Sequence, residues 1–235
     1  MNFHTDKWIM ERVNQNLDYA INNYIDYQQI VGAFYIGSAN YGLDNENSDV
    51  DIKLLILPTT EDITKCNAPI STTKSTPWGD QIQIKDIRVA FKEIEKQNVN
   101  AIEILFTEYK IILDPYKMLW SLIEKEAENY CNIHPYAFIR SCFGVLQQWT
   151  SKHYVNPTEK TRKRIVFYYN FIKKYQNGKT IKECLAYEEK DFEEAMNSKI
   201  ENSFSPKQIN ERTKREMWKL VETFIYSIFL TEEYI

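Results

Sequence analysis

Two aspartates and a Gly-Ser pair are the residues of this chain whose types and spacing best suit chemistry. Gly37-Ser38 follows an apolar run over 31–36, and after ten intervening residues Asp49 and Asp51 precede a second apolar run. Residues i and i+2 of a strand point to the same face, so we expect the two carboxylates to project side by side. Two such charges repel unless a cation lies between them, and hard oxygen ligands favour Mg²⁺ or Mn²⁺. The spacing therefore predicts a divalent metal site.

The Gly-Ser pair predicts what accompanies the metal. Glycine lets the backbone approach a phosphate closely, and exposed N–H groups after such a turn bind anions. We therefore expect Gly37 and Ser38 to hold the phosphates of a nucleoside triphosphate. An isolated Asp-x-Asp is usually a solvated strand face, and an isolated Gly-Ser is usually a turn. Their combination between two apolar strands favours the site.

These residues resemble the signature of the DNA polymerase beta superfamily of nucleotidyltransferases, and look most like its bacterial and phage branch of predicted nucleotidyltransferases. The similar motifs are Gly37-Ser38-x-x-x-Gly42-Leu43-x-x-x-x-Ser48-Asp49-x-Asp51, Asp86-Ile87-Arg88 with Phe91, and Asn98-Val99-Asn100-x-x-Glu103-x-Leu105-Phe106. Val99 stands where the family usually has proline. The segment from Lys163 to Gly178 resembles a helical Lys-x-x-x-His-x-x-Arg motif, with Phe167 in place of His and Asn170 in place of Arg.

The resemblance is strong over 31–106 and weak beyond. It implies an α+β fold in two parts. A nucleotidyltransferase-type mixed β-sheet with flanking helices is expected over 1–114. An all-helical C-terminal domain is expected over 115–235.

The resemblance also implies a third carboxylate on a neighbouring strand. The segment 81–86 alternates polar and apolar residues, as a strand does, and Asp86 lies in phase with its inward-facing isoleucines. Asp86 is thus the predicted third metal ligand, with Asp80 as the alternative. An Asp before the helix-like run 87–97 is equally a natural N-cap. If Gln83 occupies the family's position instead, the site is one acid short, and the sequence leaves these alternatives open.

The implied function is transfer of a nucleoside monophosphate from a nucleoside triphosphate, expected to be ATP, to an acceptor hydroxyl with release of pyrophosphate. A protein side chain, an RNA 3′ end and a small molecule all fit as the acceptor. The alternative is a catalytically degenerate module that binds nucleotide or a partner protein. The residues implied as catalytic and as Mg²⁺ or Mn²⁺ ligands are Asp49, Asp51 and Asp86, and those implied in nucleotide binding are Gly37, Ser38 and Lys163.

Positive charge is concentrated over 152–182, where nine basic residues face one acid, and the segment that follows is acidic. Such a basic face can bind a triphosphate or an RNA backbone, or it can be a solvated helix face beside its acidic neighbour. Lys163 is the member expected to reach the triphosphate, because of its family match and because a lysine is a flexible point charge.

Composition predicts a cytoplasmic globular protein without a membrane partner. Of 235 residues 43% are hydrophobic, yet no stretch approaches the ~20 apolar residues that span a bilayer. No basic segment followed by an apolar run resembles a signal peptide. The four cysteines are widely spaced and are expected to be reduced thiols. The net charge of −4 argues mildly against a long nucleic acid as acceptor, and homo-oligomerisation is left open.

Hydrophobic periodicity predicts the elements that position these residues. Strands are expected over 31–36, 51–57, 81–86 and 110–113, with a loop or ragged hairpin over 59–79. Helices are expected over 5–29, 39–43, 87–97, 100–107, 116–129, 135–152, 158–177, 179–186, 189–198 and 206–231.

Overall fold

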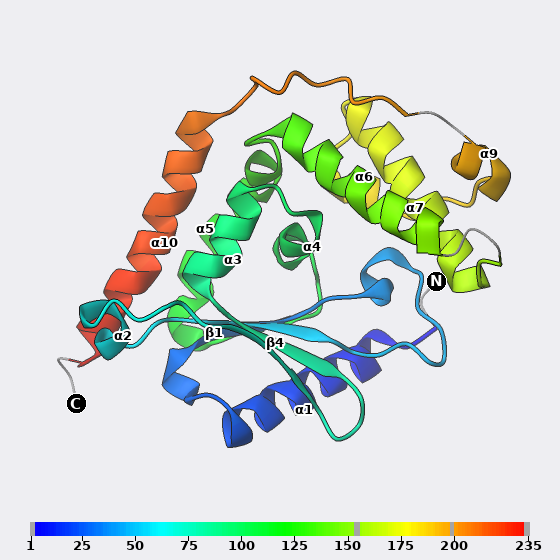
Figure 1. Cartoon of the computed structure of the whole chain (residues 1–235). Coiled ribbons are helices and arrows are strands. Elements are labelled where there is room, and N and C mark those ends of the chain that lie inside the picture. Colours follow the sequence, from blue (N-terminus) through cyan, green and yellow to red (C-terminus); the bar gives the residue numbers. More distant parts are fainter. Residues whose placement is uncertain (1–2, 153–155, 198–199, 233–235) are drawn as a thin grey trace.

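The computed structural model describes residues 3–152, 156–197 and 200–232, and it contains a five-stranded mixed sheet with helices on both faces (Figure 1). The strand order is β3-β4-β2-β1-β5, in which β2 and β4 run parallel and the other neighbours are antiparallel. The central strands β1 and β2 are buried throughout, as strands covered on both faces must be. The strands are β1 (Ile30–Tyr35), β2 (Ile52–Ile56), β3 (Ser71–Ser75), β4 (Gln81–Asp86) and β5 (Lys110–Ile112).

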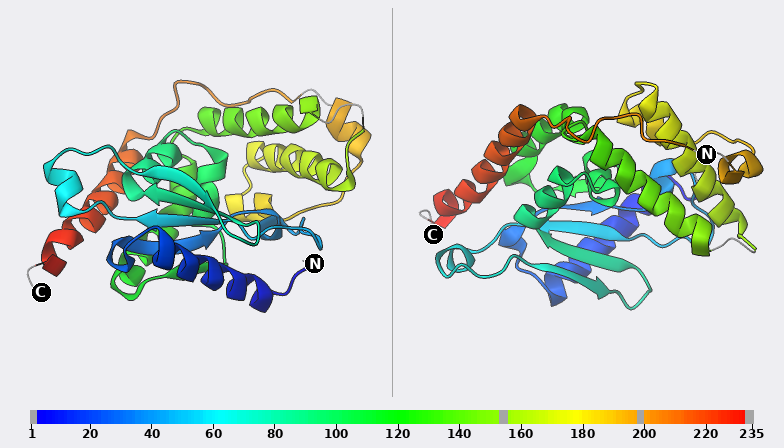
Figure 2. Two further views of the ribbon diagram at one scale, coloured as in Figure 1. Left: turned by 60° about the horizontal axis from the view of Figure 1, so that its bottom comes forward. Right: turned by 45° about the horizontal axis from the view of Figure 1, so that its top comes forward.

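Helix α1 (Asp6–Asn23) covers one face of the sheet and contacts β1, β2 and β5 (Figures 1 and 2). Its apolar residues recur every four positions, so Ile9, Val13 and Leu17 are buried on one side of the helix. Thr5 caps the helix by accepting a hydrogen bond from the Trp8 amide.

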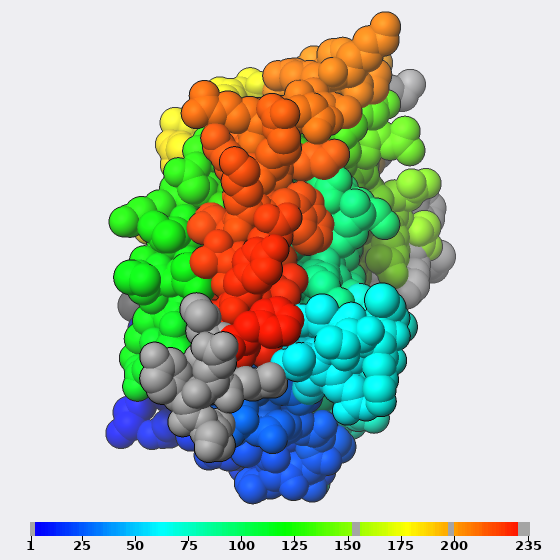
Figure 3. All heavy atoms as spheres, turned by 90° about the vertical axis from the view of Figure 1, so that its left-hand side faces the viewer, coloured from blue at the N-terminus to red at the C-terminus, as the bar shows by residue number. Residues whose placement is uncertain are grey.

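Four helices cover the other face. They are α3 (Ile87–Glu95), α4 (Val99–Ile102), α5 (Lys117–Cys131) and α10 (Glu211–Glu232). Helix α10 lies between α5 and α3, as the view onto that side of the molecule shows (Figure 3). Its residues Met217, Val221 and Phe224 are fully buried, so this late helix completes the cover of the sheet.

Four further helices form a separate layer outside the sheet. Helices α6 (Pro135–Lys152) and α7 (Glu159–Gln176) pack together, with α8 (Ile181–Leu185) and α9 (Phe192–Asn197) against α7. In Figure 1 this layer lies above the segment that follows β1. There the ring of Phe167 on α7 packs on Tyr41 of the 3-10 helix η2 (Ser38–Tyr41), with centroids 4.6 Å apart.

The expected α+β class with a mixed sheet is confirmed. The segment 59–79 holds the short helix α2 (Thr60–Thr64) and β3, which forms a hairpin with β4. The helix predicted over 5–29 ends at Asn23, because Tyr24 leaves the helical region with φ −135°. The helix predicted from 206 begins at Glu211, and the end of the one predicted over 189–198 falls outside the described residues.

The division into domains over 1–114 and 115–235 stays a prediction. One hydrophobic core cluster runs across it, from Ile9 on α1 to Phe224 on α10. Within the described ranges, no helix combines the length and the apolar character needed to cross a bilayer.

Candidate functional site

The turn after β1 places Gly37-Ser38 at the end of a central strand. Gly37 has φ +149°, and a Cβ there would lie 2.8 Å from the Tyr35 hydroxyl, so the position requires glycine. The same hydroxyl accepts a hydrogen bond from the Ala39 amide at 3.0 Å, which holds the turn against the strand. Ser38 then begins η2 with its side chain buried.

Glu103, in the 3-10 helix η3 (Glu103–Leu105), fastens this turn. Its Oε1 accepts hydrogen bonds from the Gly37 amide at 2.8 Å and from Asn40 Nδ2 at 2.9 Å. Burial raises the pKa of Glu103, and hydrogen bonds from Asn40, Tyr41 and the Gly37 amide oppose that rise. The Gly37 amide is therefore already bonded within the protein, so its N–H is not free for the phosphate that the sequence predicts at this turn.

Asp49 and Asp51 lie in the loop that leads into β2, with Asp49 exposed and Asp51 partly buried. The backbone oxygen of Asp51 accepts a hydrogen bond from the Ile36 amide at 2.9 Å, which fixes the loop beside the end of β1. Its Oδ1 accepts one from the Gln81 amide at 2.7 Å. Burial raises the pKa of Asp51, and neighbouring carboxylates, Asp49 foremost, raise it further. The structure thus brings the two aspartates within electrostatic reach of each other.

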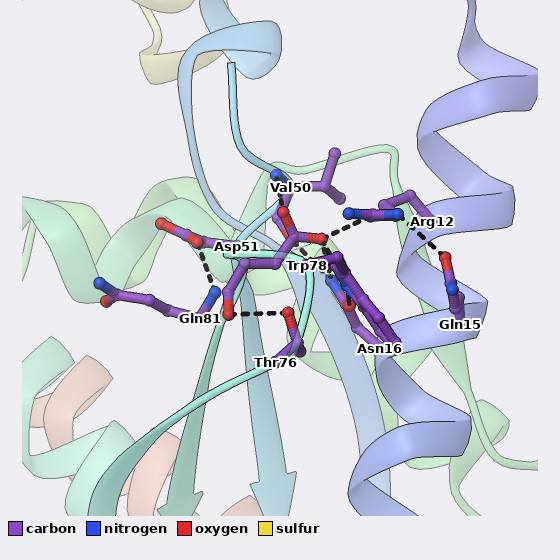
Figure 4. A network of polar contacts seen from close by, with 9 residues as sticks. Arg12, Gln15, Asn16, Val50, Asp51, Thr76, Trp78 and Gln81 are labelled. Carbon is purple, nitrogen blue, oxygen red and sulfur yellow. Dashed lines mark hydrogen bonds and ion pairs between the residues drawn. The ribbon is translucent and has the colours of Figure 1, made fainter. Parts of the chain in front are cut away.

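Asp80 lies buried beneath this loop, and both of its carboxylate oxygens accept hydrogen bonds from other residues of the protein. Its Oδ1 accepts a hydrogen bond from the Val50 amide, between the two aspartates, at 3.1 Å. Its Oδ2 accepts hydrogen bonds from Arg12 at 2.6 Å, Asn16 at 3.0 Å and Trp78 at 3.1 Å, a network that ties α1 to the loop (Figure 4). Asp80 therefore positions Asp49 and Asp51 and does not join them as the alternative third ligand.

The structure does not bring Asp86 to the two aspartates, which corrects the expectation that it completes the metal site. In the parallel pairing of β2 with β4, Asp86 stands opposite Ile56, four residues beyond Ile52. It lies roughly 13 Å along the sheet from that strand start and on the face opposite to Asp51. Its carboxylate caps α3 by accepting a hydrogen bond from the Arg88 amide at 2.8 Å, and it pairs with the Arg88 guanidinium at 2.6 Å. The N-cap interpretation describes it correctly.

The face that carries Asp51 instead presents Lys53 and Gln83, which stand opposite each other in the register. The position open to a third acid is therefore held by an amide. Lys53 is buried, and its Nζ donates a hydrogen bond to the Asn100 carbonyl at 2.9 Å. Burial lowers the pKa of Lys53 to about 8. Sequence reasoning missed Lys53, although its i+2 spacing from Asp51 places it on the same face.

Of the two lysines at the start of α7, Lys160 and not Lys163 hydrogen-bonds into the site. Lys160 Nζ donates a hydrogen bond to Ser48 Oγ at 3.2 Å, and Ser48 Oγ accepts another from Ser38 Oγ at 3.3 Å. Burial and the charge of Arg164 lower the pKa of Lys160, while Asp49 and other acids of the site oppose that change. Lys163 pairs with Glu159 on its own helix at 2.8 Å and is 44% exposed.

Lys160 lies one helical turn before the predicted residue. The sequence could have indicated Lys160 as well, because residues three apart on a helix share a face.

Two hollows flank Gly37 and share Asn100 and Glu103 in their walls. The first, of about 240 Å³, lies between the Gly-Ser turn and the helical layer, and we call it the helix cleft. Its walls include Ser38, Gln148, Trp149, Arg164 and Tyr168. The second, of about 390 Å³, lies over the sheet, and we call it the sheet cleft. Its walls include Asp51, Lys53, Gln83, Lys85, Asn98 and Asn100.

The side chains fit one divalent cation better than two. Asp49 and Asp51 are neighbouring carboxylates that would supply two oxygen ligands, and Mg²⁺ is often held by one or two carboxylates with substrate phosphates completing its shell. Among the described residues no three His, Cys, Asp or Glu side chains are grouped to hold a metal. A second metal ion would need the carboxylate that Asp80 and Asp86 do not supply.

Compared with known proteins, the chain matches no protein-family model, and no curated protein is significantly similar to it.

Proposed function

We propose that this chain is a metal-dependent nucleotidyltransferase with a nucleotidyltransferase-type core, transferring a nucleoside monophosphate from a nucleoside triphosphate to a hydroxyl. The observation that carries the proposal is the convergence of three features at one place. They lie where β1 ends and β2 begins. They are the neighbouring carboxylates of Asp49 and Asp51, the Gly37-Ser38 turn that requires glycine, and the ammonium of Lys160. Carboxylates beside a cation-lined turn are suited to hold a metal–triphosphate complex.

Each residue has a role that follows from its place. Asp49 and Asp51 would hold Mg²⁺ or Mn²⁺, which when bound neutralises phosphate charge and orients the reacting groups. Ser38 and Lys160, joined through Ser48, would bind the β- and γ-phosphates. The helix cleft, with Trp149 and Tyr168 in its wall, would receive the base and ribose of the nucleotide, expected to be ATP.

The reaction forms one bond and breaks one. The acceptor oxygen bonds to the α-phosphorus, the bond from the α-phosphorus to the bridging oxygen breaks, and pyrophosphate leaves. The proton of the acceptor hydroxyl passes to solvent.

A second candidate function is a degenerate module that binds nucleotide or a partner protein without turnover. One specific observation favours it: Asp80 and Asp86 are both committed elsewhere, and Gln83 occupies the face of Asp51. The complete Gly-Ser turn and the paired aspartates favour the enzyme.

The two functions separate in one experiment. Wild type and Asp49→Asn are incubated with each labelled nucleoside triphosphate, Mg²⁺ or Mn²⁺ and cell lysate, and pyrophosphate release and label transfer are measured. The control is Asp18→Asn, an exposed aspartate on α1. We expect transfer by wild type and by the control, and a loss of about 100-fold in Asp49→Asn, corresponding to about 3 kcal/mol of transition-state stabilisation.

Equal transfer by wild type and Asp49→Asn would contradict the proposal. Tight nucleotide binding by wild type without any Asp49-dependent pyrophosphate release would establish the binding module instead.

A further inference from the structure

Lys53 is a buried cation that forms no direct ion pair among the described residues. The charges of Glu103 and Glu93 act on it from a distance, but neither carboxylate is bonded to it. It is 3% exposed, and its Nζ makes one hydrogen bond, to a backbone carbonyl. In the part of the chain that the structure describes, no carboxylate lies within ion-pair distance of it. An ammonium carries three donors, and buried charges in proteins are normally paired. The position of Lys53 in the wall of the sheet cleft therefore points to an anionic group that enters the cleft.

Three of the four other charged groups of the sheet cleft are already engaged, and the fourth, Asp51, is assigned above to the metal. Lys85 Nζ donates to both carboxylate oxygens of Glu93, at 2.5 and 2.6 Å. Glu103 directs Oε1 to the Gly37 amide and to Asn40. Lys53 is thus the cation of this cleft that is left to bind an anion. The amides of Gln83, Asn98 and Asn100 add neutral hydrogen-bonding groups around it.

The sheet cleft lies on the side where an attacking group belongs. Phosphoryl transfer places the attacking and leaving oxygens roughly in line through phosphorus. The leaving pyrophosphate is assigned to Ser38 and Lys160, on the side of the helical layer. The attacking hydroxyl then approaches from the side of Asp51 that faces β4, and that side opens into the sheet cleft.

We propose that the sheet cleft binds the acceptor, and that the acceptor is a small hydroxyl-bearing molecule with a phosphate or carboxylate group that pairs with Lys53. This inference rests on the proposed transferase function. The hydroxyl oxygen forms the new bond to the α-phosphorus, pyrophosphate leaves, and the hydroxyl proton passes to solvent. The anionic group stays bound to Lys53 and does not react. A volume of about 390 Å³ suits a metabolite-sized ligand.

The test uses inorganic phosphate as the probe of the anion site. Phosphate is titrated calorimetrically into the full chain, with and without Mg²⁺ and a non-hydrolysable ATP analogue. We expect wild type to bind phosphate in both conditions. Lys53→Met should weaken phosphate binding about tenfold or more, as for loss of a charged hydrogen bond, and should leave the affinity for the ATP analogue unchanged. The matched control is Lys110→Met, whose lysine lies outside the sheet cleft, is paired with Glu124 and should change phosphate affinity less than threefold when replaced.

A second measurement does not depend on how the variants fold. The ¹⁵N and ¹H signals of the Lys53 side chain in wild type should shift on adding phosphate, whereas those of Lys110, outside the cleft, should stay within the noise. Phosphate binding that survives in Lys53→Met, or a Lys53 signal that does not respond, would overturn the inference. Loss of ATP-analogue affinity in Lys53→Met would also overturn it, by placing Lys53 among the nucleotide groups.

The fate of the label names the acceptor class. Transfer to an acidic metabolite, inhibited by phosphate in competition with the acceptor and not with the nucleotide, supports the inference. Label on protein or RNA would overturn it while leaving the transferase proposal intact. Failure of wild type to bind the ATP analogue would instead contradict the proposed function, because the phosphate titration without analogue reports on Lys53 independently.

Discussion

Asp51 is a carboxylate whose surroundings disfavour its charge. Burial and the nearby acids raise its pKa, so between the ordinary aspartate pKa and the raised one the folded state binds more protons than the unfolded state. The stability that protonation supplies is present at low pH and is lost as pH rises through the raised pKa. At neutral pH the ionised side chain therefore opposes folding.

We expect Asp51→Asn to stabilise the metal-free protein at pH 7 by about 1 kcal/mol, with the gain disappearing as pH falls to about 4. Urea unfolding in EDTA at both pH values measures this. Added Mg²⁺ should raise the stability of wild type and leave that of Asp51→Asn unchanged. A variant that is less stable than wild type at pH 7 would show that the side chain is held by contacts and not reserved for a cation.

Asp80 illustrates the opposite case, a carboxylate that the protein has fully paired. Asp80→Ala would remove the acceptor that four hydrogen-bond donors share beneath the aspartate loop. We expect a loss of about 3 kcal/mol in the free energy of unfolding, against less than about 0.5 kcal/mol for exposed Asp18→Ala. Urea unfolding measures both changes.

Asp80 supports the loop that carries Asp49 and Asp51, and an asparagine there could not accept all four hydrogen bonds. Asp80→Asn should therefore lower Mn²⁺ affinity about tenfold, as for loss of a supporting partner, when titrated by electron paramagnetic resonance. A loss as complete as that of Asp49→Asn would place Asp80 among the ligands.

The spacing of residues in the sequence was enough to bring Gly37-Ser38 together with Asp49 and Asp51, because strand periodicity and the intervening turn are local properties. It was not enough for the third acid. Alternation showed that Asp86 faces inward, but which face of the sheet holds the site depends on the register of β4 against β2, a contact between distant segments. The same register brings Lys53 and Gln83 together, and no local pattern reveals it.

At the scale of elements, α3 begins where β4 ends. Asp86 is the last residue of β4 and the N-cap of α3. Asp86→Ala removes both the cap and the ion pair with Arg88. We expect a loss of about 2 kcal/mol in the free energy of unfolding, with Mn²⁺ binding unchanged. Asp114→Ala, at an exposed position paired with Lys117, is the control and should cost less than about 0.5 kcal/mol. Chemical unfolding and Mn²⁺ titration decide between a structural and a metal-binding Asp86.

Most elements could be predicted, since their apolar periodicity is strong. Strand β3 is the instructive exception. Its sequence, Ser71–Ser75, has no apolar alternation, and it is an edge strand that forms by pairing with β4. The end of α1 was missed because Ile25 continues the apolar repeat after the backbone has left the helix at Tyr24. The spacing of apolar residues indicates which side chains are buried, and buried side chains can continue beyond the end of a helix.

At the scale of the whole molecule, the site is made by two parts of the chain that meet at Ser48. Lys160 crosses from α7 to the aspartate loop, so the helical layer contributes charge as well as cover. We expect Lys160→Met to weaken binding of Mg²⁺–ATP about tenfold, as for loss of a charged hydrogen bond, whereas Lys163→Met should change it less than about twofold. Calorimetric titration of the two variants measures this. Equal losses would mean that the basic helix acts only through its overall field.

Helix α10 has a consequence for how the protein is made. Trp218 donates a hydrogen bond to Glu95 on α3 at 3.1 Å, and Phe224 packs near Tyr116 at the start of α5, with ring centroids 6.0 Å apart. During synthesis the sheet and α3 leave the ribosome long before α10 does, because residues emerge in order. The helices α3 and α5 are therefore translated well before the helix that covers them. Until residue 224 has emerged, the apolar side chains of α3 and α5 that pack against α10 stay exposed on the growing chain, where a chaperone can bind them.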